Sequence, residues 1–249
     1  MAAEFCEIWR LLIIFVNMLT NSEIKQIRSL REKKFRDELG MFAVEGEKMV
    51  AEALKSSFEV VRVIREEEIG AAAMSRISQC SSPSPVLAIV RLPREEAPSA
   101  LPDGLVLALD SVRDPGNFGT ILRIADWFGV NVIFASPDCV ETFNPKTVQA
   151  SMGSVFRVRV YRRDIPSVCR EFATSGRPVY GTVLDGDNIY SSELSPTGLV
   201  VMGNESTGIS REVSALLDHR LRIPSFGGGA ESLNVAVATA VTLSEFRRR

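Results

Sequence analysis

Residues 105–135 read LVLALDSVRDPGNFGTILRIADWFGVNVIFA. The stretch begins with an apolar run, turns through the sequence DPG, and continues with apolar residues at helical spacing as far as Gly129. This order predicts the strand Leu105–Leu109, a helix over Phe118–Phe128 and a second strand, Val130–Ala135. A strand–helix–strand unit of this kind favours parallel pairing of its two strands.

The same alternation continues to the end of the chain. The other strands predicted here are Arg157–Tyr161, Pro178–Leu184, Gly198–Met202 and Arg220–Ile223. The helices predicted between and after them are Lys146–Met152, Ile165–Ala173, Ser210–Leu217 and Leu233–Arg248. Residues 105–249 are therefore predicted to form an α/β domain with a mainly parallel sheet, covered by helices on both faces.

A smaller α/β module is predicted over residues 18–92. Its predicted elements are a helix Thr20–Leu30 capped by Asn21 or Ser22, the strands Met41–Val44, Val60–Ile64 and Val86–Val90, and the helices Glu47–Lys55 and Glu66–Met74. Residues 93–104 hold three prolines and three acidic residues, a composition typical of an exposed linker. We place the domain boundary there.

The first 17 residues contain a short apolar run, Leu11–Val16. Crossing a bilayer takes about 20 apolar residues, so we expect no membrane span here. Glu4 and Glu7 lie where a signal peptide carries positive charge. We interpret residues 1–17 as an upstream extension, with Met18 as the natural start.

The whole-chain charge of −2 gives no support to a nucleic-acid partner, so an RNA-binding surface would have to be local. Candidates are the basic run Lys25–Arg36 and four arginines: Arg157, Arg159, Arg162 and Arg163. On charge alone, a solvated helix face explains such a run more often than RNA contact does.

Cysteine and histidine usage narrows the chemistry. Cys6, Cys80, Cys139 and Cys169 are scattered without a CxxC pair, which favours reduced thiols in a cytosolic protein over disulfides or zinc ligands. His219 is the only histidine, so a histidine-based triad or a multi-histidine metal site is not expected.

Three segments carry polar or glycine-rich loops after predicted strands. The first is the DPG turn already quoted, with Arg123 six residues beyond Asn117. The second, LVVMGNESTGIS at 199–210, matches neither the phosphate-binding loop of nucleotide hydrolases nor the dinucleotide fingerprint. The third, IPSFGGGAESLNV at 223–235, brings three glycines before a long helix. Taken singly, each has an ordinary alternative: a strand–helix turn with a surface arginine, a glycine turn, and a helix cap by Ser232 or Asn234.

Together the three segments resemble the signature motifs of the SpoU (TrmH) family of RNA ribose methyltransferases, within the SPOUT superfamily. The matching residues occur in family order. They are Asp110, Asp114-Pro115-Gly116-Asn117, Gly119 and Arg123; Gly203-Asn204-Glu205-Ser206 and Gly208-Ile209-Ser210; and Ile223-Pro224 with Glu231-Ser232-Leu233-Asn234-Val235.

The resemblance implies a deep trefoil knot that holds S-adenosylmethionine. Backbone groups at Gly203, Ile223 and Leu233 are then expected to contact this cofactor, with Thr182 nearby. The matching positions also imply a catalytic set of Arg123, Asn117, Glu205, Ser232 and Asn234. A guanidinium keeps its proton at neutral pH, so we favour electrostatic stabilisation of the reacting oxygen by Arg123 over base catalysis. Glu205 is the carboxylate to test as proton acceptor.

The N-terminal module resembles the substrate-binding domain of the same family, which is related to a ribosomal-protein RNA-binding fold. The resemblance covers the segment from Lys33 to Lys48, which includes GMFAVEGEK at 40–48. It implies a phosphate-contacting surface made of Arg28, Arg31, Lys33, Lys34 and Arg36. A homodimer is also expected from the family.

The sequence therefore predicts a cytoplasmic S-adenosylmethionine-dependent RNA methyltransferase with no bound metal. Its expected target is a ribose 2′-hydroxyl of ribosomal RNA, with transfer RNA as second choice and base methylation as a lesser alternative. Two other classes of protein stay open: a non-catalytic RNA-binding or ribosome-assembly factor, and a nucleotide-dependent enzyme such as a dehydrogenase.

Overall fold

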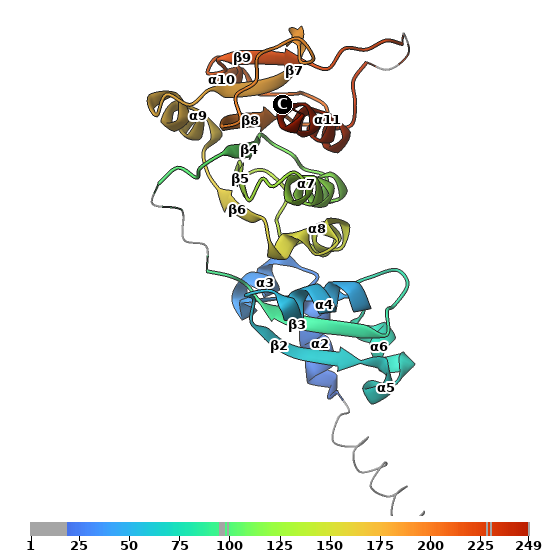
Figure 1. Ribbon diagram of the computed structural model, residues 1–249. Helices are drawn as coiled ribbons and strands as arrows, with labels where there is room; N and C mark the ends of the chain where they lie inside the picture. The colour runs from blue at the N-terminus through green and yellow to red at the C-terminus, as the bar shows by residue number, and fades with distance from the viewer. Residues whose placement is uncertain (1–18, 95–97, 99, 228, 230, 249) are drawn as a thin grey trace, which may run out of the picture. The chain divides into compact units, whose positions relative to one another are not determined.

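The computed structural model describes residues 19–94, 98, 100–227, 229 and 231–248 (Figure 1). It divides into two compact units. Unit 1 runs up to Pro93 and includes Phe143–Pro145, and unit 2 comprises Arg94–Thr142 and the chain from Lys146 onward. The predicted extension 1–17 lies outside the described residues.

Unit 1 is built on a three-stranded antiparallel sheet in the order β1-β3-β2, with β1 Met41–Glu45, β2 Val60–Arg65 and β3 Val86–Arg91. Its helices are α2 Asn21–Ser29, α3 Lys33–Leu39, α4 Glu47–Lys55, α5 Glu66–Ile69 and α6 Ala71–Ile77. Alternate strand residues such as Ala43, Leu87 and Ile89 share one core with α2 and α6. The intervening residues point to the other face of the sheet, where α4 contacts β1 and β3.

Several details of unit 1 differ from the sequence-based expectation. Thr20, rather than Asn21 or Ser22, caps α2, because Glu23 stands three residues later and closes a reciprocal capping box with it. The helix predicted over Glu66–Met74 is divided at Gly70, whose φ of 82° is incompatible with a continuous helix. The basic run includes a separate helix, α3, that the pattern did not predict.

Unit 2 contains a six-stranded sheet in the order β6-β5-β4-β8-β7-β9, in which every pair of neighbouring strands is parallel. The strands are β4 Leu105–Leu109, β5 Val132–Ala135, β6 Arg159–Arg162, β7 Val179–Asn188, β8 Gly198–Met202 and β9 His219–Arg222. The helices are α7 Pro115–Trp127, α8 Pro145–Ser151, the 3-10 turn η1 Ser154–Phe156, α9 Ile165–Thr174, α10 Arg211–Ser214 and α11 Val235–Arg247. The predicted α/β fold with a mainly parallel sheet is confirmed.

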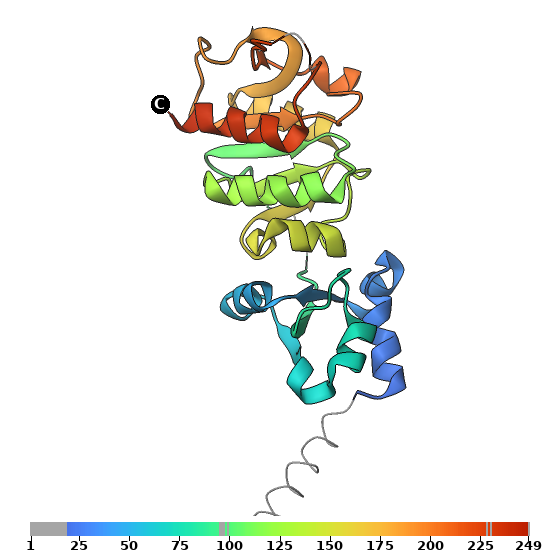
Figure 2. The same ribbon diagram turned by 90° about the vertical axis from the view of Figure 1, so that its right-hand side faces the viewer.

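Helices cover both faces of this sheet (Figure 1). On one face, α9 and α10 pack with Val106, Ala108 and Val201 around a common apolar core. On the other face, α7 and α11 lie side by side, although 107 residues separate the last residue of α7 from the first of α11 (Figure 2). The strands of the sheet centre are buried along their whole length, as expected when both faces are covered.

Element boundaries in unit 2 shift where a cap or a bulge decides them. The helix predicted from Phe118 begins at Pro115, because Asp114 accepts the backbone N–H of Asn117 and Pro115 fits the first helical position. β7 extends to Asn188 through an irregularity in its pairing with β9. In the part of the chain that the structure describes, no helix is both long enough and apolar enough to span a membrane.

Candidate functional site

The predicted cofactor-contacting residues lie at the carboxyl edge of the parallel sheet. Thr182 pairs with Leu221 of β9, and its neighbour Gly181 pairs with Val201 of β8. Gly203 directly follows β8, and Ile223 directly follows β9. Adjacent parallel strands therefore bring Gly203, Thr182 and Ile223 to one edge, the place where open α/β sheets bind ligands.

One chain of side-chain hydrogen bonds joins all three sequence motifs. Asn117 Nδ2 donates to Glu205 Oε1 at 3.0 Å, and Asn234 Nδ2 donates to Asn117 Oδ1 at 2.8 Å. The first bond spans 88 residues of sequence and the second spans 117. The structure thus brings Asn117, Glu205 and Asn234 together. We call this set the Asn117 network.

Helix caps fix two members of the network. Asn117 is the residue whose backbone N–H the Asp114 carboxylate accepts at 2.7 Å, in the first turn of α7. Asn234 is the N-cap of α11, and its Oδ1 accepts the backbone N–H groups of Ala236 and Val237. The same side chain therefore begins α11 and links it to α7.

The loop after β8 is a tight turn with no room for a side chain at its first residue. Asn204 and Gly208 exchange backbone hydrogen bonds of 3.0 Å, and a Cβ at Gly203 would collide with the backbone of Gly208 and Ile209. Only glycine allows this approach. Glu205 is carried on the exposed end of the turn.

Two residues that were not predicted as site residues tie the loop to β4. Asp110 is buried directly after β4, and its Oδ2 accepts the backbone N–H of Ser210 at 2.8 Å. Asn204 Nδ2 donates to the carbonyl of Ser111 at 2.7 Å. Both residues stand inside the sequence motifs, but only the folded chain shows what they bind.

The other predicted site residues do not join the Asn117 network. Arg123 is exposed on α7, and the structure shows no hydrogen bond or ion pair from it to any described residue. Six residues of helix place it about 9 Å along the axis from Asn117. Ser232 and Leu233 are exposed just before α11, and Thr182 is half-buried, with its hydroxyl near the carbonyl of Val201.

Two protein-family models match the chain. The family model described as the SpoU rRNA Methylase family matches residues 104–244, more than half of the chain. The chain belongs to this family. A second model, the MRM3-like substrate binding domain, matches residues 21–88.

Individual relatives of the SpoU family resemble the chain over nearly its whole length. The chain is 32% identical to the Bacillus subtilis 23S rRNA (guanosine(2553)-2′-O)-methyltransferase RlmP, over 91% of this chain and 96% of that protein. The structure superposes on a TrmH-family protein of Porphyromonas gingivalis with a TM-score of 0.84 and 39% identity, covering 93% of this chain and 99% of the other. An AdoMet-bound rRNA methyltransferase from Sinorhizobium meliloti gives a TM-score of 0.83 and 32% identity, covering 93% and 96%.

The five basic residues predicted to contact RNA phosphates do not share one environment. Arg28, Arg31, Lys33 and Lys34 are exposed in unit 1. Arg36 is only 1% exposed, and its guanidinium donates to the carbonyls of Leu30 and Arg31. Arg36 therefore does not lie on the exposed surface as predicted, because it satisfies the backbone of the turn between α2 and α3.

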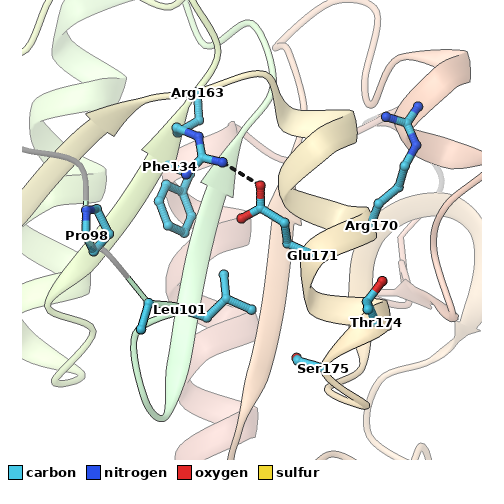
Figure 3. Close-up of a pocket in the computed structure, with 9 residues that line it drawn as sticks. Pro98, Leu101, Phe134, Arg163, Arg170, Glu171, Thr174 and Ser175 are labelled. Atoms are coloured by element: carbon cyan, nitrogen blue, oxygen red, sulfur yellow. Dashed lines mark hydrogen bonds and ion pairs between the residues drawn. The ribbon is translucent and has the colours of Figure 1, made fainter.

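A cavity of about 500 Å³ lies elsewhere in unit 2, along α9 (Figure 3). In Figure 3 the Arg163 side chain points to Glu171, with which it forms an ion pair. The residues that line this cavity are Pro98, Ala100, Leu101, Phe134, Arg163, Arg170, Glu171, Thr174 and Ser175. It contains none of the predicted cofactor or catalytic residues, and α9 covers the sheet face opposite to α7 and α11.

Cysteine chemistry plays no part in this site. Cys80, Cys139 and Cys169 are free thiols, as predicted for them, and Cys6 lies outside the described residues. Burial raises the pKa of Cys169 to about 12 and also raises the pKa of Cys139, so both stay protonated at neutral pH. Among the residues that the structure describes, no group of His, Cys, Asp and Glu is arranged to hold a metal ion.

Replacing Asn234 separates its two roles. We expect Asn234→Ala to lower the free energy of unfolding by about 1 kcal/mol, because the cap of α11 is lost. Asn234→Asp keeps the capping oxygen but removes the N–H that reaches Asn117, so its stability should stay within about 0.5 kcal/mol of wild type. Both variants should lose methyl-transfer activity. Denaturant unfolding and a transfer assay check this, and an Asp variant with full activity would show that the link to Asn117 is dispensable.

Proposed function

We propose that the protein transfers a methyl group from S-adenosylmethionine to a ribose 2′-hydroxyl of ribosomal RNA. The Asn117 network carries this proposal, because it gathers polar groups of all three motifs at the ligand-binding edge of the sheet. The relatives support it: RlmP is named as a 23S rRNA 2′-O-methyltransferase, and the Sinorhizobium meliloti protein is an rRNA methyltransferase bound to AdoMet. These names favour an enzyme over the non-catalytic RNA-binding factor.

The residues at the sheet edge fit S-adenosylmethionine. Gly203 begins a turn that is too tight for a side chain, and the half-exposed Leu233 and half-buried Ile223 offer apolar surface in the segment between β9 and α11. Such a surface suits a cofactor with an adenine ring and a hydrophobic thioether arm. We assign its binding to backbone groups at Gly203, Ile223 and Leu233, with the hydroxyl of Thr182 nearby. When bound, the cofactor supplies an electrophilic methyl group.

The substrate hydroxyl is a weak acid, so the enzyme must stabilise negative charge on its oxygen as the new bond forms. Arg123 is an exposed cation on α7 that the described residues leave uncompensated by any ion pair. A guanidinium in this position offers several N–H donors to a developing oxyanion and keeps its proton at neutral pH. We assign Arg123 to charge stabilisation rather than to proton removal.

The Asn117 network orients the groups around the reacting oxygen. Asn117 is held by both neighbours, so its side chain has one amide orientation that satisfies Glu205 and Asn234 together. Glu205 is exposed, and its Oε2 accepts Asn204 Nδ2 at 3.4 Å. We assign Glu205 as the proton acceptor, and Ser232, exposed two residues before Asn234, as a further polar contact of the substrate.

Unit 1 is proposed to bind the RNA. The match to a substrate-binding domain supports this role, and so do the exposed cations Arg28, Arg31, Lys33 and Lys34. Phosphate contacts by such side chains would give a local basic surface on a protein whose net charge is −2. We place the connection between the domains at residues 93–104. We also propose a cytoplasmic location, which the similarity to a bacterial ribosomal RNA methyltransferase supports.

The knot and the homodimer are also proposed. The chain passes from β9 at the sheet edge, through residues 223–234, back to α11 beside α7, and such a return supports threading through a loop. A chain path in which residues 223–249 do not pass through a loop would contradict the knot.

The homodimer is supported by exposed apolar side chains on the two neighbouring helices. Trp127 of α7 is 84% exposed and Val237 of α11 is 50% exposed. A second copy would bury these exposed apolar side chains, and their exposure on both helices supports the dimer.

Arg123 provides the direct test of the proposed chemistry. We expect Arg123→Ala to lower kcat at least about 100-fold, since a donor to the developing oxyanion is lost. Arg123→Lys keeps the charge without the planar fork and should be intermediate. Tritium transfer from S-adenosylmethionine to deproteinised ribosomal RNA from a strain lacking the gene measures this. Arg170→Ala, an exposed arginine on α9, is the control. When both RNAs are offered, label that enters transfer RNA and not ribosomal RNA would contradict the proposed substrate.

Charge reversal on unit 1 tests RNA binding. We expect Arg28→Glu with Lys34→Glu to weaken RNA binding about tenfold or more and to flatten its salt dependence, by about 0.7 in log–log slope for each lost contact to single-stranded RNA. Filter binding at several salt concentrations measures both quantities. Lys48→Glu with Lys55→Glu makes the same charge change on α4, on the other side of the sheet, and should bind almost as wild type does.

The exposed apolar side chains of α7 and α11 allow a test of assembly. Trp127→Glu and Val237→Glu each replace one of them with a charge and are expected to convert dimers to monomers in sedimentation equilibrium. Leu184→Glu, at a position 71% exposed on β7, serves as the matched control. A wild-type chain that sediments as a monomer at micromolar concentration would sink the proposed dimer.

A further inference from the structure

A carboxylate outside the three motifs reaches the site through the turn after β4. Asp138 lies in the loop after β5, where its Oδ1 accepts Ser136 Oγ at 2.6 Å and its Oδ2 accepts Ser111 Oγ at 2.6 Å. Arg113 also donates to Oδ2, at 2.9 Å. Asp138 therefore connects the loops that follow two neighbouring strands.

Ser111 has a backbone conformation that a serine rarely adopts. Its φ is 63°, and only one other non-glycine residue in the described part of the chain, Met152, has a positive φ. This left-handed region is unfavourable for residues with a Cβ and occurs where the surroundings enforce it. Here the Ser111 N–H donates to Ser136 Oγ at 2.9 Å, and its hydroxyl donates to Asp138. Ser136 and Asp138 together thus bind the backbone N–H and the side-chain hydroxyl of Ser111.

The carbonyl of Ser111 faces the second motif. It accepts Asn204 Nδ2 at 2.7 Å, and Asn204 Oδ1 in turn accepts the backbone N–H groups of Ser206 and Thr207. Asn204 therefore links the turn on which Glu205 lies to the carbonyl of Ser111. A change in the φ of Ser111 would change the direction of this carbonyl and displace the turn on which Glu205 lies.

We propose that Asp138 is a positioning residue for methyl transfer: by enforcing the left-handed turn at Ser111 it sets the carbonyl that Asn204 binds, and so sets where Glu205 meets Asn117. This inference rests on the function proposed above. Hydrogen bonds from Ser111, Ser136 and Arg113 hold the pKa of Asp138 well below its usual range. The carboxylate therefore stays ionised and accepting throughout the neutral pH range.

Kinetics of Asp138 variants test the proposal. Asp138→Ala is expected to lower kcat by about 10- to 100-fold, the scale on which small misplacements of reacting groups act, with a smaller change in the KM for S-adenosylmethionine. Asp138→Asn, which keeps one acceptor oxygen and the shape, should be less impaired. The control Asp126→Ala removes a carboxylate that also accepts a serine hydroxyl and an arginine, Ser154 and Arg157, without any bond to Ser111. Its kcat per folded molecule should match wild type.

Glycine at position 111 distinguishes positioning from general stabilisation. Glycine adopts positive φ without a steric penalty, so Ser111→Gly alone should keep kcat within about threefold of wild type. In the Asp138→Ala background it should restore kcat to within about threefold of the Ser111→Gly variant. A double variant as impaired as Asp138→Ala, or an unimpaired Asp138→Ala, would overturn the proposal.

A second measurement does not depend on activity. Ser111→Gly should raise the midpoint of thermal unfolding more in the Asp138→Ala background than in wild type, because the turn has lost its enforcing carboxylate only there. Equal effects in both backgrounds would contradict the role of Asp138 at Ser111. A wild-type chain that transfers no methyl group, combined with the expected coupling, would instead contradict the proposed function and leave the turn intact.

Discussion

The Asn117 network is the interaction on which the site depends. Asn117 is simultaneously a donor to Glu205 and an acceptor from Asn234. The three residues come from distant parts of the sequence, so only the folded chain brings them together. Each bond is exposed, so its net contribution to stability is small, about 0.5–1.5 kcal/mol for a typical hydrogen bond. Its importance is geometric, because it brings side chains from three separate loops into one arrangement.

That alignment is possible because rigid elements hold each loop at its root. The parallel strands fix where the loops begin, and the helix caps at Asp114 and Asn234 fix where two of them end. The third loop is a tight turn because Gly203, which has no Cβ, lies against the backbone of Gly208 and Ile209. Polar side chains placed on such a frame lose little conformational freedom when they meet. The proposed role of Asp138 extends the same principle by one more loop.

Much of the fold could be predicted from the sequence, because hydrophobic periodicity is strong in unit 2. The strand Leu105–Leu109 and the strand Gly198–Met202 are uninterrupted apolar runs, and the structure confirms both. The capping residue of α2 and the break at Gly70 do not follow from periodicity, because a reciprocal pair of hydrogen bonds decides the first and one positive φ decides the second. The family assignment is confirmed, and the motif residues of the network do meet.

Other features depend on contacts between residues that are distant in sequence, and no local sequence pattern indicates them. The burial of Arg36 depends on carbonyls at the end of α2, and a basic run reads the same whether its arginines face water or backbone. Asp138 is separated by 27 residues from Ser111 and carries no motif of its own. The catalytic and cofactor roles assigned to the site residues, those of the Asn117 network included, stay predictions, because geometry alone does not test them.

The strand order has a consequence for how the chain is made. In unit 2 the central strand β4 pairs with β8, which starts 89 residues after β4 ends, and every neighbouring pair is parallel, so the contacts that define the sheet join distant parts of the sequence. Sheets of this kind fold slowly, because long loops must close before their pairing is rewarded. During synthesis the ribosome releases β4, β5 and β6 well before β8 exists, which leaves the backbone N–H and C=O groups along one edge of β4 without their partners. The half-made sheet is then the stage at which this protein is most exposed to aggregation and most dependent on chaperones.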